Sequence, residues 1–267
     1  MVQNKHYTMN IINTTVVSAA LIAGSVYAGE IQPIVAPTPE VSPVSGTLDL
    51  SYNTHFVSYG ADVWGVGTDF GTDATFNPSI NLDYAVTDNL TLSTGVWFDV
   101  NDNAPPSIGG DVQEVDFWLG AAYAMGSHNM SVTYQAWEYA SDTEKIVDVA
   151  YGYDHWLNPS ALAHFRVDEG ASGGNTGVFF VLGVEPGKEF ESFSLSFPVA
   201  VAFTPDDFHG GDSGFGYASA GIQASYPFSH GWSLNGGLTG YMTNDEVIPG
   251  NVDENFLTGN IGVSLDF

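Results

Sequence analysis

The chain has 267 residues, and 31 Asp and Glu against 4 Lys and Arg give it a formal net charge of −27. This charge repels phosphate backbones, so nucleic acid is excluded as a partner. The absence of cysteine excludes disulfides, thiolate metal sites and cysteine nucleophiles. With 44% hydrophobic and 13% aromatic residues, the composition predicts a folded body.

Residues 1–28 have the features of a secretory signal peptide. Lys5 precedes an apolar run over 16–23, and Val26-Tyr27-Ala28 is a small-x-small cleavage pattern. The run is shorter than the roughly 20 residues of a transmembrane helix, and an internal hydrophobic strand is the alternative. Residues 29–46 are rich in proline, so we expect an extended periplasmic linker.

From residue 47, apolar and polar residues alternate along twelve segments, and this period of two predicts β-strands. In the last segment, Leu257, Ile261 and Leu265 share one face, and the chain ends on Phe267. The predicted strands are 48–56, 76–86, 90–99, 114–123, 130–135, 147–154, 160–168, 177–185, 193–203, 220–226, 232–242 and 256–267. An even number suits a single-chain barrel whose two ends both face the periplasm.

The connections between these segments alternate in length. Long ones, such as 60–75 and 204–214, follow odd-numbered strands, and short ones, such as 87–89 and 126–127, follow even-numbered strands. Outer-membrane barrels have long extracellular loops and short periplasmic turns, whereas a soluble sandwich has no reason to sort its loops in this way. The pattern therefore predicts an all-β fold, a single antiparallel transmembrane β-barrel of twelve strands over residues 47–267.

Aromatic residues on the apolar faces lie near the short turns. They are Tyr84, Tyr123, Tyr153, Tyr226, Phe228, Trp232 and Phe267. In a membrane barrel they would form the periplasmic aromatic girdle, and in a soluble protein they would be core residues.

The polar strand faces would line the lumen of such a barrel, and their charged groups are almost all acids. The candidate pore-lining residues are Asp49, Asp83, Asp99, Glu114, Asp116, Asp148, Asp154, Arg166, Asp168, Glu185 and Asp266. Twelve strands enclose a lumen of intermediate width, between small barrels that side chains fill and large ones that leave a channel. Small residues on the same faces therefore favour an open lumen.

Three tryptophans would also point into the lumen from adjacent strands. Trp97, Trp118 and Trp137 are therefore candidates for an aromatic stripe on which sugar or nucleobase rings stack. The alternative is that they simply fill the lumen.

Two groups of residues resemble catalytic arrangements. Gly170-Ala171-Ser172-Gly173-Gly174 matches a nucleophile elbow, but no helical periodicity follows it. Ser160 and His164 share a strand face, but four residues span about 13 Å, too far to share a proton. The sequence therefore predicts no enzymatic activity and no cofactor.

One loop carries a group of possible metal ligands. Asp206, Asp207, His209 and Asp212 lack the spacing of an EF-hand, although hard cations accept irregular sets of oxygen ligands. Solvated loop acids are the alternative.

The signal peptide, the alternating strands and the terminal Phe267 resemble Gram-negative outer-membrane β-barrels. Within that class, the size, the acidic loops and the aromatic first strand 51–60 are similar to the TorF family of porin-like proteins. Tyr59-Gly60 stands where that family usually has Arg-Gly. The resemblance implies passive transport, with outer-membrane lipid, small solutes or cations, and the barrel-assembly machinery (through Phe267) as partners.

Three functions remain open at this stage. The first is an outer-membrane, porin-like channel for passive diffusion of small solutes, which would prefer cations because of its acidic lumen. The second is a plugged barrel that acts as a surface binding or structural protein through its acidic loops. The third is a soluble secreted β-protein.

Overall fold

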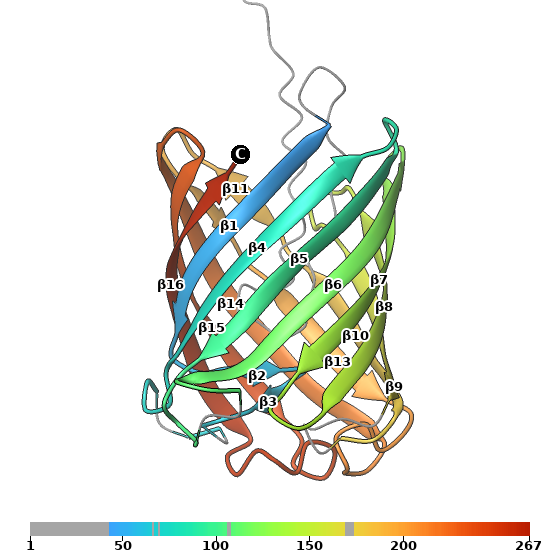
Figure 1. Ribbon diagram of the computed structural model, residues 1–267, viewed down its shortest axis with the longest axis vertical. Coiled ribbons are helices and arrows are strands. Elements are labelled where there is room, and N and C mark those ends of the chain that lie inside the picture. The colour runs from blue at the N-terminus through green and yellow to red at the C-terminus, as the bar shows by residue number, and fades with distance from the viewer. Residues whose placement is uncertain (1–42, 66, 69, 106–107, 169–173) are drawn as a thin grey trace, which may run out of the picture.

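The structure is a computed structural model that describes residues 43–65, 67–68, 70–105, 108–168 and 174–267. The predicted signal peptide and most of the predicted linker lie outside this part, as does most of the Gly-x-Ser-x-Gly motif. The fold is a closed barrel of twelve antiparallel strands (Figure 1). No helix in the described ranges is long and apolar enough to cross a membrane.

The barrel wall follows the chain order. Its strands are β1 (Val44–Asn53), β4 (Thr75–Ala85), β5 (Leu90–Val100), β6 (Val112–Met125), β7 (His128–Glu138), β8 (Thr143–Tyr153), β9 (Ser160–Asp168), β10 (Gly177–Val184), β13 (Val199–Thr204), β14 (Gly214–Ser229), β15 (Trp232–Thr243) and β16 (Asn255–Asp266). The short strands β11 (Gly187–Glu189) and β12 (Ser194–Ser196) lengthen the β10–β13 hairpin, and β2 (Val57–Ser58) pairs with β3 (Ala61–Asp62) in a sheet of their own. All twelve predicted strands are present, and β1 begins at Val44, three residues before the predicted start of the barrel at residue 47.

The first and last wall strands close the ring. β1 pairs with β16 from Thr47↔Asp266 to Asn53↔Asn260. The ladder continues to Phe267, whose N–H donates to the Gly46 carbonyl at 3.0 Å and whose carbonyl accepts from the Gly46 N–H at 2.8 Å. A Cβ atom at Gly46 would lie 2.7 Å from the Phe267 ring, so this seam requires glycine.

The two faces of the wall are sorted as the alternation predicted. Leu119 and Ile261 on the outer face are 64% and 57% exposed, whereas Thr91 and Asp99 on the inner face are fully buried. This arrangement is the reverse of a soluble protein, and an outer surface in contact with lipid requires it.

An aromatic girdle surrounds one end of the barrel. Tyr84, Tyr123, Tyr226 and Phe228 are outward and exposed at the short-turn end. The C-terminus lies at this end, and β2 and β3 lie at the other (Figure 1). Short turns face the periplasm in outer-membrane barrels, so the long loops face outside.

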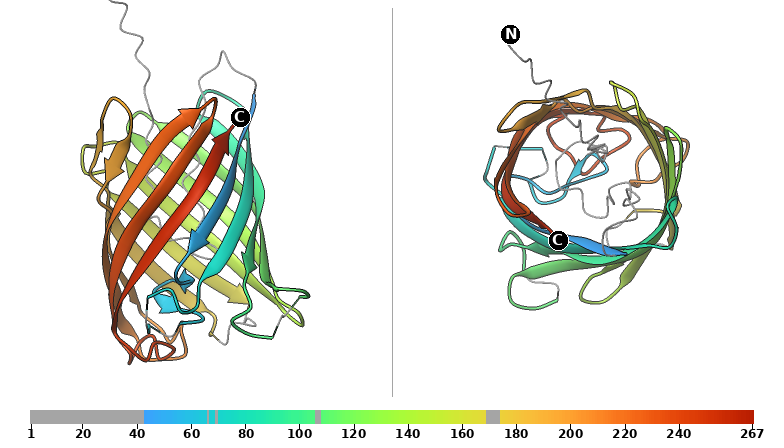
Figure 2. Two further views of the ribbon diagram at one scale, coloured as in Figure 1. Left: turned by 90° about the vertical axis from the view of Figure 1, so that its left-hand side faces the viewer. Right: turned by 90° about the horizontal axis from the view of Figure 1, so that it is seen from above.

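The first strand ends earlier than predicted. β1 ends at Asn53, and Phe56, which we expected on the apolar outer face, is buried inside the barrel. Thr54 still pairs with Gly259, through its N–H to the Gly259 carbonyl at 2.8 Å. The chain then turns into the lumen, and Figure 2 shows the cyan segment crossing the ring interior. We call residues 54–65 the inward segment.

Residues 186–192, which connect two of the predicted strands, do not form a simple short turn. The β10–β13 hairpin continues into them as far as Glu189. Pro186 and Pro198 interrupt its two strands, since proline has no N–H for the ladder. The predicted strand 193–203 is therefore split into β12 and β13. The actual turn lies between β11 and β12, where Phe190 and Phe193 stack with ring centroids 4.6 Å apart.

A glycine on the inner face gives the first test of this packing. A Cβ atom at Gly95 would lie 2.1 Å from Trp118 Cζ2 and 2.3 Å from the Ile80 carbonyl oxygen, whereas one at Gly152 would meet nothing within 4 Å. We expect Gly95→Ala to lower the free energy of unfolding by about 1–3 kcal/mol and Gly152→Ala to leave it nearly unchanged. Urea unfolding in detergent, followed by heat-modifiable gel migration, measures both, and equal effects would contradict the packing.

Candidate functional site

Three segments fill the long-loop end of the lumen. The inward segment meets the loops 205–213 and 244–254 in one apolar cluster. Its loop residues are Val57, Tyr59, Phe208, Val247 and Ile248, and its wall residues include Trp137, Ile146, Phe179, Tyr217 and Tyr241. Packed side chains therefore fill part of this end, because the long loops fold inward, whereas the small lining residues alone favoured an open lumen.

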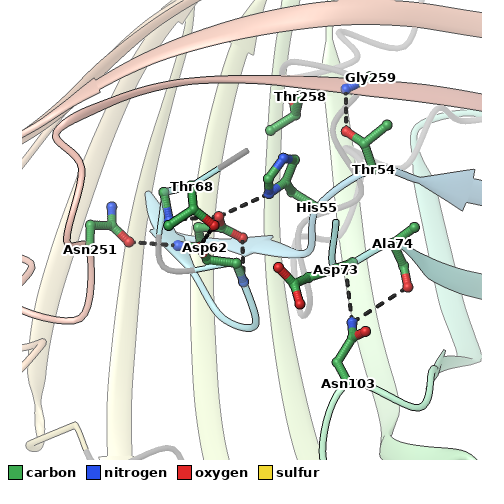
Figure 3. Close-up of polar contacts among 12 residues, drawn as sticks. Thr54, His55, Asp62, Thr68, Asp73, Ala74, Asn103, Asn251, Thr258 and Gly259 are labelled. Atoms are coloured by element: carbon green, nitrogen blue, oxygen red, sulfur yellow. Dashed lines mark hydrogen bonds and ion pairs between the residues drawn. The ribbon is translucent and has the colours of Figure 1, made fainter. Parts of the chain in front are cut away.

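Polar contacts hold the inward segment in place (Figure 3). The Asp62 carboxylate lies 2.9 Å from His55 Nδ1 and accepts the Gly67 N–H at 2.7 Å. Asn251 from the last long loop accepts the Asp62 N–H at 2.9 Å and donates to the Gly60 carbonyl at 2.8 Å. Both side chains of the His55–Asp62 pair are fully buried, so these bonds are shielded from water.

Tyr59 lies at the tip of the inward segment. It forms the β2–β3 turn with Gly60, and both have positive φ, 48° and 86°, as a type I′ turn requires. Its ring centroid lies 3.6 Å from that of His164 and 6.2 Å from that of Trp137. Its carbonyl accepts a hydrogen bond from His209 Nε2 at 3.1 Å. We call the rings around Tyr59, those of Trp137, His164, Phe179 and Phe208, together with Trp97, the seat.

The predicted aromatic stripe forms part of this seat. Trp97 and Trp137 are 7% and 1% exposed and face inward, as predicted. Phe56 packs on Trp97 at 5.4 Å between ring centroids, and Trp64 and Trp118 pack against that pair. The stripe therefore contacts the inward segment rather than free lumen.

Most of the predicted lining residues do point inward. Buried or half-buried on the inner face are Asp49, Asp83, Asp99, Glu114, Asp116, Asp148, Arg166 and Glu185. The other three lie at strand ends, where Asp154 is exposed, Asp168 pairs with Lys145, and Asp266 accepts from Thr47 Oγ1 at 2.8 Å.

Asp99 connects the wall to the inward segment. Its carboxylate accepts hydrogen bonds from Trp64 Nε1 at 2.8 Å, Asn101 Nδ2 at 2.9 Å and Asn77 Nδ2 at 3.1 Å, and also from Thr75 Oγ1. With so many donors, this acid is a structural anchor.

Glu114 and Asp116 are different, because few donors reach them. Tyr139 donates to Glu114 Oε1 at 2.9 Å. No donor in the described part of the chain hydrogen-bonds to either oxygen of Asp116, although its carboxyl interacts with that of Glu114. Burial, with the charge of Glu114, raises the pKa of Tyr139 well above its ordinary value, so this phenol stays a donor.

Arg166 binds one buried acid and two loops. Its Nε donates to Glu144, and its Nη1 donates to the carbonyls of Phe208 at 2.6 Å and Asn175 at 3.2 Å. The guanidinium also lies 4.0 Å from the Phe208 ring centroid. Glu144 was not among the predicted lining residues, because the predicted strand starts only at residue 147. β8 begins at Thr143, and Glu144 shares its inner face with Ile146 and Asp148.

His164 is held in a chain of polar groups. Its Nδ1 lies 2.5 Å from Asp148 Oδ1, Gln135 donates to the other Asp148 oxygen at 2.6 Å, and Trp137 donates to Gln135 at 2.9 Å. No described contact joins Ser160 to this histidine. His164 is therefore oriented by Asp148 and not by Ser160.

The four possible metal ligands of the 205–213 loop do not converge. Asp206 accepts from the Val178 N–H at 3.0 Å and Thr204 Oγ1 at 2.6 Å, Asp207 binds Asn175, and His209 binds Tyr59. Across the described ranges, no three His, Asp or Glu side chains are placed to hold a metal ion.

A closed ring of twelve antiparallel strands, apolar outside and polar inside, defines an outer-membrane β-barrel. No family model and no curated protein matches the sequence. The fold is similar to the COG4313 outer membrane channel from Pseudomonas putida F1, with a TM-score of 0.53 and 13% identity over 89% of this chain and 100% of that chain. It is also similar to the NanC porin, with a TM-score of 0.52 and 10% identity over 82% and 98% of the two chains. The KdgM porin gives a TM-score of 0.49 and 8% identity over 83% and 99%. Identities this low establish the fold alone.

The Arg166–Glu144 pair predicts a large effect from a single change. Both side chains are almost fully buried, at 4% and 0% exposed, so Arg166→Met would leave a buried unpaired carboxylate and destabilise the barrel by about 3–5 kcal/mol. Arg166→Met combined with Glu144→Met should recover most of this loss. Lys145→Met removes an exposed pair and should cost at most about 1 kcal/mol. Urea unfolding of the three variants tests this order, and a double variant as unstable as the single one would refute it.

His209 predicts a pH dependence. Burial, together with the positive charge of Arg166, lowers the pKa of His209 from 6.5 to about 3. The unfolded chain takes up a proton below about pH 6.5 and the folded one does not, so stability falls as pH drops from 6.5 towards 3. Between pH 7.5 and pH 5, the thermal midpoint of wild type should fall more than that of His209→Gln. Parallel midpoints would show that this ring does not contribute.

Proposed function

We propose that this protein is an outer-membrane channel for passive diffusion of small solutes, with a preference for cations. The observation that carries the proposal is the charge of the inner face, where Arg166 is the one base among the predicted lining residues and the rest are acids. Carboxylates beside a narrow, low-dielectric path raise the local concentration of cations and repel anions.

The acids differ in how free they are to act on ions. The Asp99 carboxylate accepts a hydrogen bond from Trp64, and the Asp148 carboxylate contacts His164, so protein groups already occupy both. Glu114 and Asp116 have fewer donors in the described part of the chain, so their neutral variants disturb fewer hydrogen bonds and test the charge of the lining most directly.

A second candidate function is a plugged barrel that binds partners through its acidic loops. The partly filled long-loop end favours it, because three loops fold into the mouth that a solute would enter. The two candidates differ in one property, since a plugged barrel carries no ion current.

Several finer expectations belong to the proposal. Without a Ser–His pair in the described chain, we infer a protein that is not an enzyme. The aromatic first strand supports membership of the TorF family. The exposed Phe267 at the girdle supports contact with lipid and recognition by the barrel-assembly machinery.

The test is the reversal potential of single channels across a tenfold KCl gradient. We expect a cation-selective wild type, most selective at low salt and less so near 1 M, where the screening length is about 3 Å. Glu114→Gln with Asp116→Asn should reduce the preference, because these groups lie inside the barrel. Asp111→Asn, on an exposed loop, is the matched control and should leave it unchanged. An anion-selective wild type would refute cation preference, and a folded barrel without current would favour the plugged alternative.

A further inference from the structure

The inward segment occupies an aromatic surface that belongs to the barrel wall. Phe56 covers Trp97, and Tyr59 stacks on Trp137 at an interplanar angle of 21° and lies over His164. Phe179 and Phe208 complete the seat around Tyr59, each at an edge-on angle. Two rings of the chain itself therefore lie where flat rings stack well.

The inward segment covers the rings of the seat but leaves some of the seat's polar atoms without a hydrogen bond. Within the described ranges, Trp97 Nε1 and His164 Nε2 are buried without a hydrogen-bond partner, and no donor reaches the oxygens of Asp116, whose carboxyl interacts with that of Glu114. Asp116 pairs directly with Trp97 on one side and with Trp137 on the other, so the acid and both rings lie side by side on the inner face. Each buried polar group without a partner is unfavourable.

The pattern of these atoms defines the chemistry of a better occupant. Trp97 Nε1 is a donor and the Asp116 oxygens are acceptors, so a ligand needs both an acceptor and a donor. The stacked tryptophans require a flat face. A hydroxyl or amino group on a flat ring has these properties, whereas the bare Phe56 ring offers no polar group.

The inward segment is also attached in a way that permits release. β2 and β3 pair only with each other and share no ladder with the wall. Tyr59 has a φ of 48°, an unfavourable backbone conformation for a bulky residue. Beyond the Thr54–Gly259 pair at its start, the segment is held chiefly through Asp62, Asn251 and Trp64.

We propose that the seat is a binding site for a flat ring bearing hydroxyl or amino groups, such as a nucleoside, and that Phe56 and Tyr59 occupy it until such a solute displaces them. The inference rests on the proposed channel function, since the solute must enter the lumen. It assigns a ligand class to Trp97, Trp137 and Asp116 and makes the inward segment a competitor for that ligand.

The experiment measures adenosine binding to the detergent-solubilised full barrel by quenching of tryptophan fluorescence, with ribose as the probe that lacks the flat ring. Phe56→Ala with Tyr59→Ala empties the seat, so adenosine should bind at least ~10-fold more tightly than to wild type, because competition lowers apparent affinity. Adding Trp97→Ala or Asp116→Asn should remove the gain, and ribose should not bind in any variant. Trp156→Phe, at an exposed tryptophan outside the lumen, is the matched control and should leave the affinity unchanged.

A variant outside the seat makes the test independent of the alanine variants. Asn251→Ala removes the hydrogen bonds to the Asp62 N–H and the Gly60 carbonyl that hold the inward segment. It should raise adenosine affinity above that of wild type, because the segment then competes less well for the seat.

The outcomes separate this site from the channel function. Equal adenosine affinity in wild type, in Phe56→Ala with Tyr59→Ala and in Asn251→Ala, or no binding to any of them, would overturn the proposed site even if ion current is normal. Adenosine binding that follows release of the inward segment, in a barrel that carries no current, would support the site and refute the channel.

Discussion

The structure depends on the closure of its hydrogen-bond ladder. In lipid, no water is present to pair with a free N–H or C=O, so a β-sheet spans a membrane only as a ring without edges. Here β1 and β16 make that closure, and it extends to the last residue because Phe267 pairs with Gly46. Once the ring is closed, alternate side chains must face lipid, and the remaining half must share the interior.

The interior has more room than wall side chains alone can fill. Gly152 faces open space on the inner face, and the inward segment and the other two long loops enter from the outer end. The loops bring rings that stack on the wall tryptophans. The same loops place His55, Asp62 and Asn251 in positions where they satisfy one another.

The interior acids therefore have two different roles. Asp99 receives several hydrogen bonds and Glu144 is paired with Arg166, so both contribute to holding loops against the wall. Asp116 lies between two tryptophans with no donor from the described residues. An acid of the first kind stabilises the fold, and Asp116 is the acid to which the proposed site assigns a ligand. Composition alone counts them equally.

The alternation of apolar and polar residues was enough to predict the barrel, its strand order, its girdle and the inward direction of Asp99, Asp116 and the tryptophans. A strand period of two and the sorting of loop lengths are local signals, and the membrane leaves few folds that fit them. The path of the loops could not be predicted in this way, because Phe56 continues the alternation of β1 although the chain has already turned inward. The stacking of Tyr59 on Trp137 and the pairing of Glu144 with Arg166 follow from the folded chain alone, since these contacts join distant segments and depend on the space that the closed ring encloses.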